Sequence, residues 1–136
     1  MEKLDDFKVV LLGIVFDPKR KKILIGRRDK DPYVPNLSWG FPGGRLNNKE
    51  DVEESLKKTI KNKTNLKVEN LGSVFSRVFP DKNNFFLVYF LCEAVGGKEK
   101  AGAGFKELKW VSPEELQKYF TTSFHPHLKE YIMNLK

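Results

Sequence analysis

The stretch Phe41–Leu66, FPGGRLNNKEDVEESLKKTIKNKTNL, decides how the chain is expected to fold. A Pro-Gly-Gly turn runs into a helix whose first half is acidic and whose second half is basic, an order that suits the helix dipole. Val52, Leu56 and Ile60 recur at every fourth residue and predict one buried stripe along this helix. Turns of this kind often present a helix start to phosphates, and phosphate chemistry usually needs carboxylates that hold a metal ion.

The start of this helix has a signal of its own. Asn47 or Asn48 can cap the helix, and Glu50 or Asp51 then falls near its third position, as in a capping box. A helix turns by about 100° per residue. Seen down the helix axis, the acids Glu50, Glu53 and Glu54 therefore lie mostly on one side, together with Lys57 and Lys61. The opposite side carries Thr59, Asn62 and Lys63.

The length and the net charge of the chain limit the number of domains and the kinds of partner to expect. The 136 residues are enough for one domain with its own core, so we expect a single domain over residues 1–136. The formal net charge of +7 and the pI of about 9.4 favour partners that carry phosphate, such as nucleotides or RNA. Plain solubility is the alternative explanation of this charge.

The sequence also predicts where the protein resides. Its first residues, MEKLDDFK, are charged and of mixed sign, unlike a signal peptide. The apolar run Val9–Phe16 is far too short to span a bilayer. Cys92 is a single cysteine and cannot form an internal disulfide. We therefore expect a cytoplasmic protein with no membrane partner.

The remaining segments alternate strand and helix patterns. Apolar, β-branched runs separated by turn residues predict hairpins, and Ser112, Pro113 and Glu115 predict a capped helix. In chain order the expected elements are a hairpin at 7–28, an irregular loop at 29–44 with a short strand at 39–41, the helix described above, a second hairpin at 71–95, a flexible glycine-rich loop at 96–104, a strand at 105–111, and helices at 112–120 and 125–136.

This arrangement resembles the Nudix superfamily over almost the whole chain. The segments WGFPGG, Trp39–Gly44, and ELKWVSPEEL, Glu107–Leu116, are both typical of the family. The family's box reads G-x5-E-x7-R-E-U-x-E-E-x-G-U, where U is a bulky aliphatic residue. Gly44 fits its first glycine and Glu50 its first glutamate. The resemblance implies an α/β protein, a Nudix-type α/β/α sandwich with a mixed β-sheet.

The second half of the box departs from the family pattern. In the family, the later glutamates hold divalent ions that neutralise phosphates and activate the attacking water. The resemblance thus implies Mg²⁺ (or Mn²⁺) as a cofactor. Threonine and asparagine are weak substitutes for the carboxylates that Mg²⁺ prefers, and a lysine repels a cation. The departures are Lys58 at the arginine, Thr59 at the next glutamate, Asn62 and Lys63 at the paired glutamates, and Asn65 at the last glycine.

Several acids remain as candidates for a metal site. Glu50 keeps its family position and is the predicted metal ligand and catalytic residue. Glu54 lies nearer to the side that lost its glutamates and is the second predicted ligand. Some family members place a catalytic glutamate in the loop before the last strand. Here that region offers Glu99 and Glu107, with Glu93 just before it, and Glu107 is the predicted catalytic residue among them.

One branch of the family offers a partial match. The GDP-mannose mannosyl hydrolases also have an incomplete box and a GGR turn, and they attack the sugar rather than phosphorus. Arg28 and Arg45 match arginines that bind or stabilise the diphosphate there. That branch keeps an acid at the position of Lys63 and a histidine at the position of Phe105, so the similarity is partial.

Further substrate contacts are predicted around the helix. Gly43 and Gly44 of the Pro-Gly-Gly turn are expected to contact substrate, and Phe79 offers a surface for base stacking. Lys58 and Lys63 suggest a different arrangement, in which a lysine supplies positive charge to a phosphate in place of a metal. The alternative is that both lysines extend into solvent.

Three functions compete at this point. The first is a divergent Nudix hydrolase that cleaves a nucleoside diphosphate derivative (nucleotide sugar, ADP-ribose-like or nucleoside triphosphate) with weakened metal-dependent activity. The second is an inactive Nudix fold that binds a nucleotide. The third is a basic interaction module that holds RNA or a protein, although RNA-recognition motifs are absent. A homodimer is expected only by analogy with other Nudix proteins.

Overall fold

The computed structural model describes residues 8–28, 39–47, 50–79, 82–120 and 125–135. Much of the expected loop at 29–44, the turn at 80–81 and the predicted cap Asn48 lie outside the described residues. Within the described ranges, no helix is long and apolar enough to cross a membrane. The cytoplasmic location stays a prediction.

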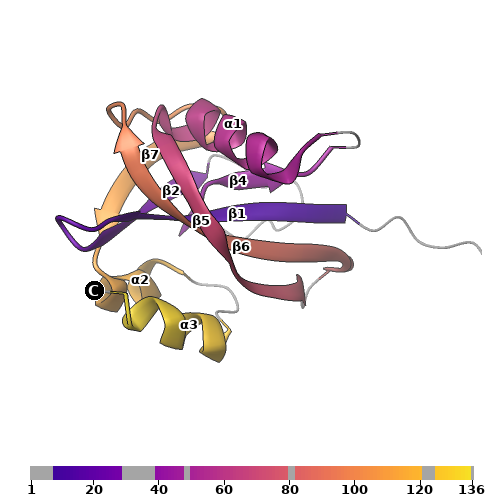
Figure 1. Cartoon of the computed structure of the whole chain (residues 1–136). Helices are drawn as coiled ribbons and strands as arrows, with labels where there is room; N and C mark the ends of the chain where they lie inside the picture. Colours follow the sequence, from indigo (N-terminus) through magenta and orange to yellow (C-terminus); the bar gives the residue numbers. More distant parts are fainter. Residues whose placement is uncertain (1–7, 29–38, 48–49, 80–81, 121–124, 136) are drawn as a thin grey trace, which may run out of the picture.

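In the part of the chain that the structure describes, seven strands form one mixed sheet with helices on both faces (Figure 1). The pairing of β1 with β6 is parallel, and the other described pairings are antiparallel. The expected α/β/α sandwich with a mixed sheet is thereby confirmed. The path through the sheet is β3 (Trp39–Gly40), β2 (Lys22–Arg28), β1 (Lys8–Asp17), β6 (Lys82–Gly96) and β5 (Lys67–Phe79), with β4 (Gly43–Arg45) paired to β1 and β7 (Phe105–Val111) to β2. The helices are α1 (Val52–Thr64) on one face, and α2 (Pro113–Tyr119) and α3 (Pro126–Met133) on the other.

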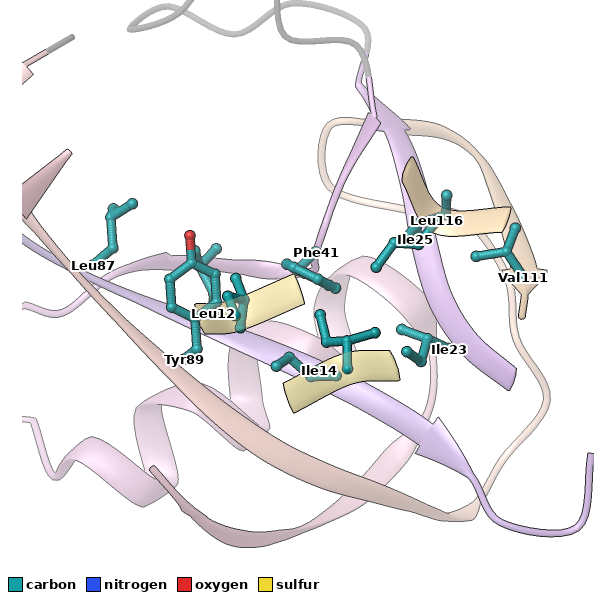
Figure 2. Close-up of a cluster of buried hydrophobic side chains, with 11 residues drawn as sticks. Leu12, Ile14, Ile23, Ile25, Phe41, Leu87, Tyr89, Val111 and Leu116 are labelled. Atoms are coloured by element: carbon teal, nitrogen blue, oxygen red, sulfur yellow. The ribbon is translucent and has the colours of Figure 1, made fainter. Parts of the chain in front are cut away.

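Two buried clusters join these layers. Successive side chains of a strand point to opposite faces. Leu12 and Ile14 of β1 therefore join the cluster under α2 and α3, while Leu11 and Val15 join the cluster under α1. Figure 2 shows the first cluster, which includes Leu116 of α2. Burial of apolar residues on both faces fixes the central strands between the helices.

The Pro-Gly-Gly segment differs from its prediction. Gly43–Arg45 forms strand β4, which pairs with Leu11 and Leu12 of β1 instead of leading straight into a helix. Helix α1 begins only at Val52. The prediction of a turn that presents a helix start was therefore wrong, because the glycine backbone is used for strand pairing.

Helix α1 also starts later than its capping residues suggested. Its N-cap is Asp51, whose carboxylate accepts a hydrogen bond from the backbone N–H of Glu54 at 3.2 Å. Asn47 as the cap was therefore wrong. A charged acceptor at Asp51 satisfies the helix end and also suits the helix dipole. Val52 is 37% exposed, so the buried stripe begins at Leu56 rather than at Val52.

The C-terminus of α1 is closed by Asn65 and by the glycine-rich loop. Asn65 has a φ of 64°, in the left-handed region, which asparagine adopts more readily than most other residues. Its side-chain Nδ2 donates to the carbonyl of Lys98 at 3.0 Å, and the N–H of Gly102 donates to the carbonyl of Lys63 at 3.0 Å. These bonds hold the loop against the helix, in contrast to the flexible loop that was predicted.

Replacing Asn65 tests this helix end. Asn65→Ala removes the bond to Lys98 and places a side chain that disfavours positive φ at a position that requires it. We expect the free energy of unfolding, measured by urea denaturation, to fall by about 1–2 kcal/mol. Asn65→Gly should lose less, because glycine carries no penalty at this φ. Equal unfolding midpoints for Asn65→Ala and the wild type would contradict this account.

Candidate functional site

Lys63, near the end of α1, contacts two residues from other parts of the chain. Its ammonium Nζ donates a hydrogen bond to the backbone carbonyl of Gly43 at 2.6 Å. The same Nζ lies 5.6 Å from the centroid of the Phe105 ring. We call Gly43, Lys63 and Phe105 the Lys63 site. Lys63 is half-buried, so the alternative that it extends freely into solvent is wrong for this lysine.

The sequence explains why β4 can approach the helix so closely. A Cβ atom on Gly43 would lie 2.1 Å from the carbonyl oxygen of Leu11, so only glycine fits against β1 here. A Cβ atom on Gly44 would lie 3.3 Å from Cγ2 of Thr59. Thr59 is one helical turn before Lys63, and the two side chains share the face of α1 that meets β4.

Phe105, the first residue of β7, contributes an aromatic ring to the Lys63 site. It is buried, and a Cβ atom on Gly26 would lie 2.6 Å from its ring, so Gly26 leaves the space that the ring occupies. The N–H of Phe105 donates to the carbonyl of Gly102 at 3.0 Å, at the end of the docked loop. The loop, helix and strand β7 therefore meet at Lys63.

A separate groove lies along the outer side of α1. Its lining includes the acids Glu50, Asp51 and Glu54 together with Lys58, and it does not include Lys63. Glu50 is exposed before the helix, and its Oε1 accepts a hydrogen bond from Nδ2 of Asn47 at 3.2 Å. The two predicted metal ligands and Lys58 thus lie together, but apart from the Lys63 site.

Glu107 is used in an ion pair on the opposite face of the sheet. Its Oε1 lies 2.7 Å from Nε of Arg27, the residue opposite it on β2. Two residues along β7, Lys109 has its Nζ 4.9 Å from the centroid of Tyr119 in α2. Side chains two apart share a face, so Glu107 lies on the α2 side. A bulge in the pairing puts Phe105, rather than Glu107, on the α1 side. The catalytic role of Glu107 stays a prediction.

Arg28 contributes to a positive region around Tyr89. Burial raises the pKa of Tyr89, while the charge of Arg77 and then that of Arg28 oppose this rise. Tyr89 belongs to the cluster under α2 and α3, and Phe79 packs partly buried against that cluster. Arg28 and Phe79 therefore lie on the side of the sheet that α2 and α3 cover, whereas Lys63 lies on the α1 side. Arg45, at the end of β4, is exposed.

Sequence reasoning missed two features of this arrangement. It did not anticipate the Gly43 carbonyl as a partner of Lys63, because β4 was interpreted as a turn. It also passed over Arg77, whose signal is a cation within the apolar alternation of β5. The loss of carboxylates on one helix face was visible in the sequence, and it is this face that meets β4.

The Lys63 site does not fit a magnesium ion. Mg²⁺ requires several oxygen ligands in octahedral geometry. The Gly43 carbonyl is such an oxygen, but it accepts a hydrogen bond from the Lys63 ammonium, which would repel the ion. The described residues contain no group of three or more histidine, cysteine, aspartate or glutamate side chains that could hold a metal ion. Metal ligation by Glu50 and Glu54 stays a prediction.

Cys92 should be chemically inert in the folded protein. Burial raises the pKa of its thiol to about 12, and the thiolate is the reactive form. We expect no reaction with a thiol reagent at pH 8 until the chain is unfolded. The folded state keeps this thiol protonated at pH values where the unfolded state has lost the proton. The free energy of unfolding should therefore fall as the pH rises above the pKa that the thiol has in the unfolded chain. Rapid labelling of the native protein would contradict the buried position.

Comparison with known proteins identifies the family. The NUDIX domain model matches residues 6–134. An ADP-ribose pyrophosphatase from Methanocaldococcus jannaschii is 32% identical over 81% of this chain, which spans only 64% of that protein. An 8-oxo-dGTP diphosphatase from Buchnera aphidicola subsp. Schizaphis graminum is 30% identical, over 82% of this chain and 81% of that protein.

Solved structures agree on the fold. The crystal structure of a NUDIX hydrolase from Nitrosomonas europaea superposes with a TM-score of 0.78 at 19% identity, over 96% of this chain and 72% of that one. A MutT structure from the study of Aliivibrio salmonicida and Vibrio cholerae gives a TM-score of 0.72 at 18% identity, over 93% of this chain and 95% of that one. The chain therefore belongs to the NUDIX domain family.

Proposed function

We propose that this Nudix domain binds a nucleoside diphosphate derivative and that its metal-dependent hydrolysis is weakened. At the level of the family, Nudix hydrolases act on nucleoside diphosphate derivatives. The observation that carries the proposal is the 2.6 Å hydrogen bond from Lys63 to the Gly43 carbonyl. It puts an ammonium group on the helix face where the family pattern has a glutamate, and an ammonium cannot be a ligand to Mg²⁺.

A second candidate retains full hydrolytic activity. Glu50 and Glu54 line one groove beside α1, together with Asp51, and two relatives at 30–32% identity are named as a pyrophosphatase and a diphosphatase. In this candidate Mg²⁺ or Mn²⁺ is held by groove carboxylates. The lysines of the same groove oppose it, because they already supply positive charge beside those acids. RNA binding and a homodimer stay predictions.

A hydrolysis screen separates the two candidates. Phosphate and nucleoside monophosphate release would be followed with ADP-ribose, nucleotide sugars, dinucleoside polyphosphates and nucleoside triphosphates, each with Mg²⁺ and with Mn²⁺. The proposal expects slow or undetectable turnover, together with measurable binding of at least one of these compounds. Efficient turnover that Glu50→Gln abolishes would establish the second candidate. If no compound in the panel is bound or cleaved, both candidates are wrong.

A further inference from the structure

We propose that the groove along the outer side of α1 binds a second copy of this chain, with the two α1 helices antiparallel about a two-fold axis. The charges of the groove are segregated along the helix, with acids at its start and lysines in its later turns and at the start of β5. A two-fold axis across the helix sets the acidic end of one copy against the basic end of the other. The acids are Glu50, Asp51 and Glu54, and the lysines are Lys57, Lys58, Lys61 and Lys67.

The charges of this groove are not paired with one another. All seven residues are exposed, and within the described part of the chain no ion pair joins an acid of the groove to one of its lysines. Glu54 and Lys58 have the i, i+4 spacing that permits such a pair on a helix, yet they do not form one. The described hydrogen bonds of Glu50 and Asp51 come from neutral donors, a side-chain amide and a backbone N–H. A partner with the reverse order of charges can therefore pair with this surface.

The spacing along α1 fixes the register of the two copies. With the axis between residues 55 and 56, Glu50 faces Lys61 of the second copy, and Glu54 faces its Lys57. Each of these pairs occurs twice, because a two-fold interface repeats every contact. A parallel arrangement in the same register would set acid against acid and lysine against lysine. The charge pattern thus selects the antiparallel arrangement.

The form of the groove also suits a second helix. In the part of the chain that the structure describes, α1 covers its face of the sheet without another helix beside it (Figure 1). The groove has a volume of about 830 Å³, and its apolar lining includes the buried Leu66 and Val68 and the exposed Val95. Val95 is 56% exposed, and its removal from water by a docked helix is favourable. Helices pack by seating the side chains of one between those of the other.

A nucleic acid is the alternative occupant that the positive net charge suggests. Its phosphates would be attracted by the lysines of the groove, but they would be repelled by Glu50, Asp51 and Glu54, which line the same groove. The groove matches a partner that carries both signs of charge in reverse order. A second copy of the chain has this pattern, because the interface pairs the surface with itself.

Sedimentation equilibrium at low salt, without nucleotide or metal, tests the proposal independently of the proposed function. One variant combines Glu50→Lys with Glu54→Lys, and the other combines Lys57→Glu with Lys61→Glu. Each variant alone sets like charges against each other, and we expect its dimer Kd to rise by about tenfold or more. An equimolar mixture of the two variants should dimerise again, because the lysines of one then face the glutamates of the other. Added salt should weaken the wild-type dimer.

A third variant separates the interface from the effect of net charge. Lys118→Glu with Lys129→Glu removes the same four units of positive charge as the lysine variant of the groove, on exposed residues of α2 and α3. Since it lowers the general repulsion between two basic chains, it should associate at least as tightly as the wild type. Loss of association in the groove variant alone would then come from the interface. Thermal unfolding of each variant would verify that it is folded.

The remaining outcomes overturn the proposal. A wild-type chain that stays monomeric up to about 1 mM at low salt has no such interface. Equal dimerisation of the folded groove variants and the wild type would place the interface elsewhere. Failure of the mixture to restore the dimer lost by each variant would show that the acids and lysines do not face each other. A monomeric chain that binds RNA through Lys57 and Lys61 would identify the alternative occupant.

Discussion

Gly43→Ala is expected to prevent folding, or to lower the free energy of unfolding by about 3 kcal/mol or more. The added Cβ would lie 2.1 Å from the carbonyl oxygen of Leu11 and 2.9 Å from the Cα of Leu12. Both are backbone atoms of β1, so no side-chain rotation relieves the contact. Strand β4 would have to separate from the sheet, and the carbonyl that contacts Lys63 would move with it.

The neighbouring glycine provides the control for this prediction. A Cβ on Gly44 would lie 3.3 Å from Cγ2 of Thr59, a side chain that can shift by a few tenths of an ångström. We expect Gly44→Ala to change stability by less than about 1 kcal/mol. Urea denaturation and thermal unfolding of the two variants would measure the difference. Equal stability of Gly43→Ala and Gly44→Ala would show that β4 does not pack against β1 as described.

Rebuilding the carboxylates of the helix should create a metal site. Thr59, Asn62 and Lys63 are spaced at i, i+3 and i+4, so they share one face of α1, and Lys63 already reaches the Gly43 carbonyl. The triple variant Thr59→Glu, Asn62→Glu and Lys63→Glu would bring three carboxylates toward that oxygen. We expect Mn²⁺ binding to appear, and Mg²⁺-dependent turnover of the panel to rise by about a hundredfold or more, because a bound metal is worth several kcal/mol in such reactions.

The control for the rebuilt helix matches its change in charge. Lys118→Glu with Lys129→Glu alters the net charge by the same four units, on exposed residues of α2 and α3, on the opposite face of the sheet. This variant should gain neither specific Mn²⁺ binding nor turnover. Mn²⁺ binding followed by electron paramagnetic resonance would measure the first effect. Equal Mn²⁺ affinity in the two variants would show that the face toward β4 is not a cation site.

Much of the fold could be predicted because it follows from local patterns. Apolar strands and the capping box at Ser112 are encoded by neighbouring residues. The start of α1 could not be fixed in this way, because Asn47, Asn48 and Asp51 are all residue types that can cap a helix. Only the three-dimensional packing selects Asp51 among them.

The candidate site was only partly predictable for a similar reason. The loss of carboxylates and the presence of Lys63 can be read directly from the sequence. Its contact with Gly43 depends on a strand pairing between β4 and β1, which no local pattern specifies. The position of Phe105 depends on a bulge in the pairing of β2 with β7, because one shifted residue moves a side chain to the other face of the sheet.

The most direct test of the central claim is binding of the nucleotide panel to the wild-type chain with and without divalent metal. Titration calorimetry would be performed with ADP-ribose and the nucleotide sugars, first in EDTA and then in excess Mg²⁺. The account predicts that at least one compound binds in EDTA with an affinity close to that in Mg²⁺, because the helix face that meets β4 carries Lys63 where a metal-binding glutamate would be needed. Binding that requires Mg²⁺ and is lost in Glu50→Gln would contradict it, and would identify the groove carboxylates as a working metal site.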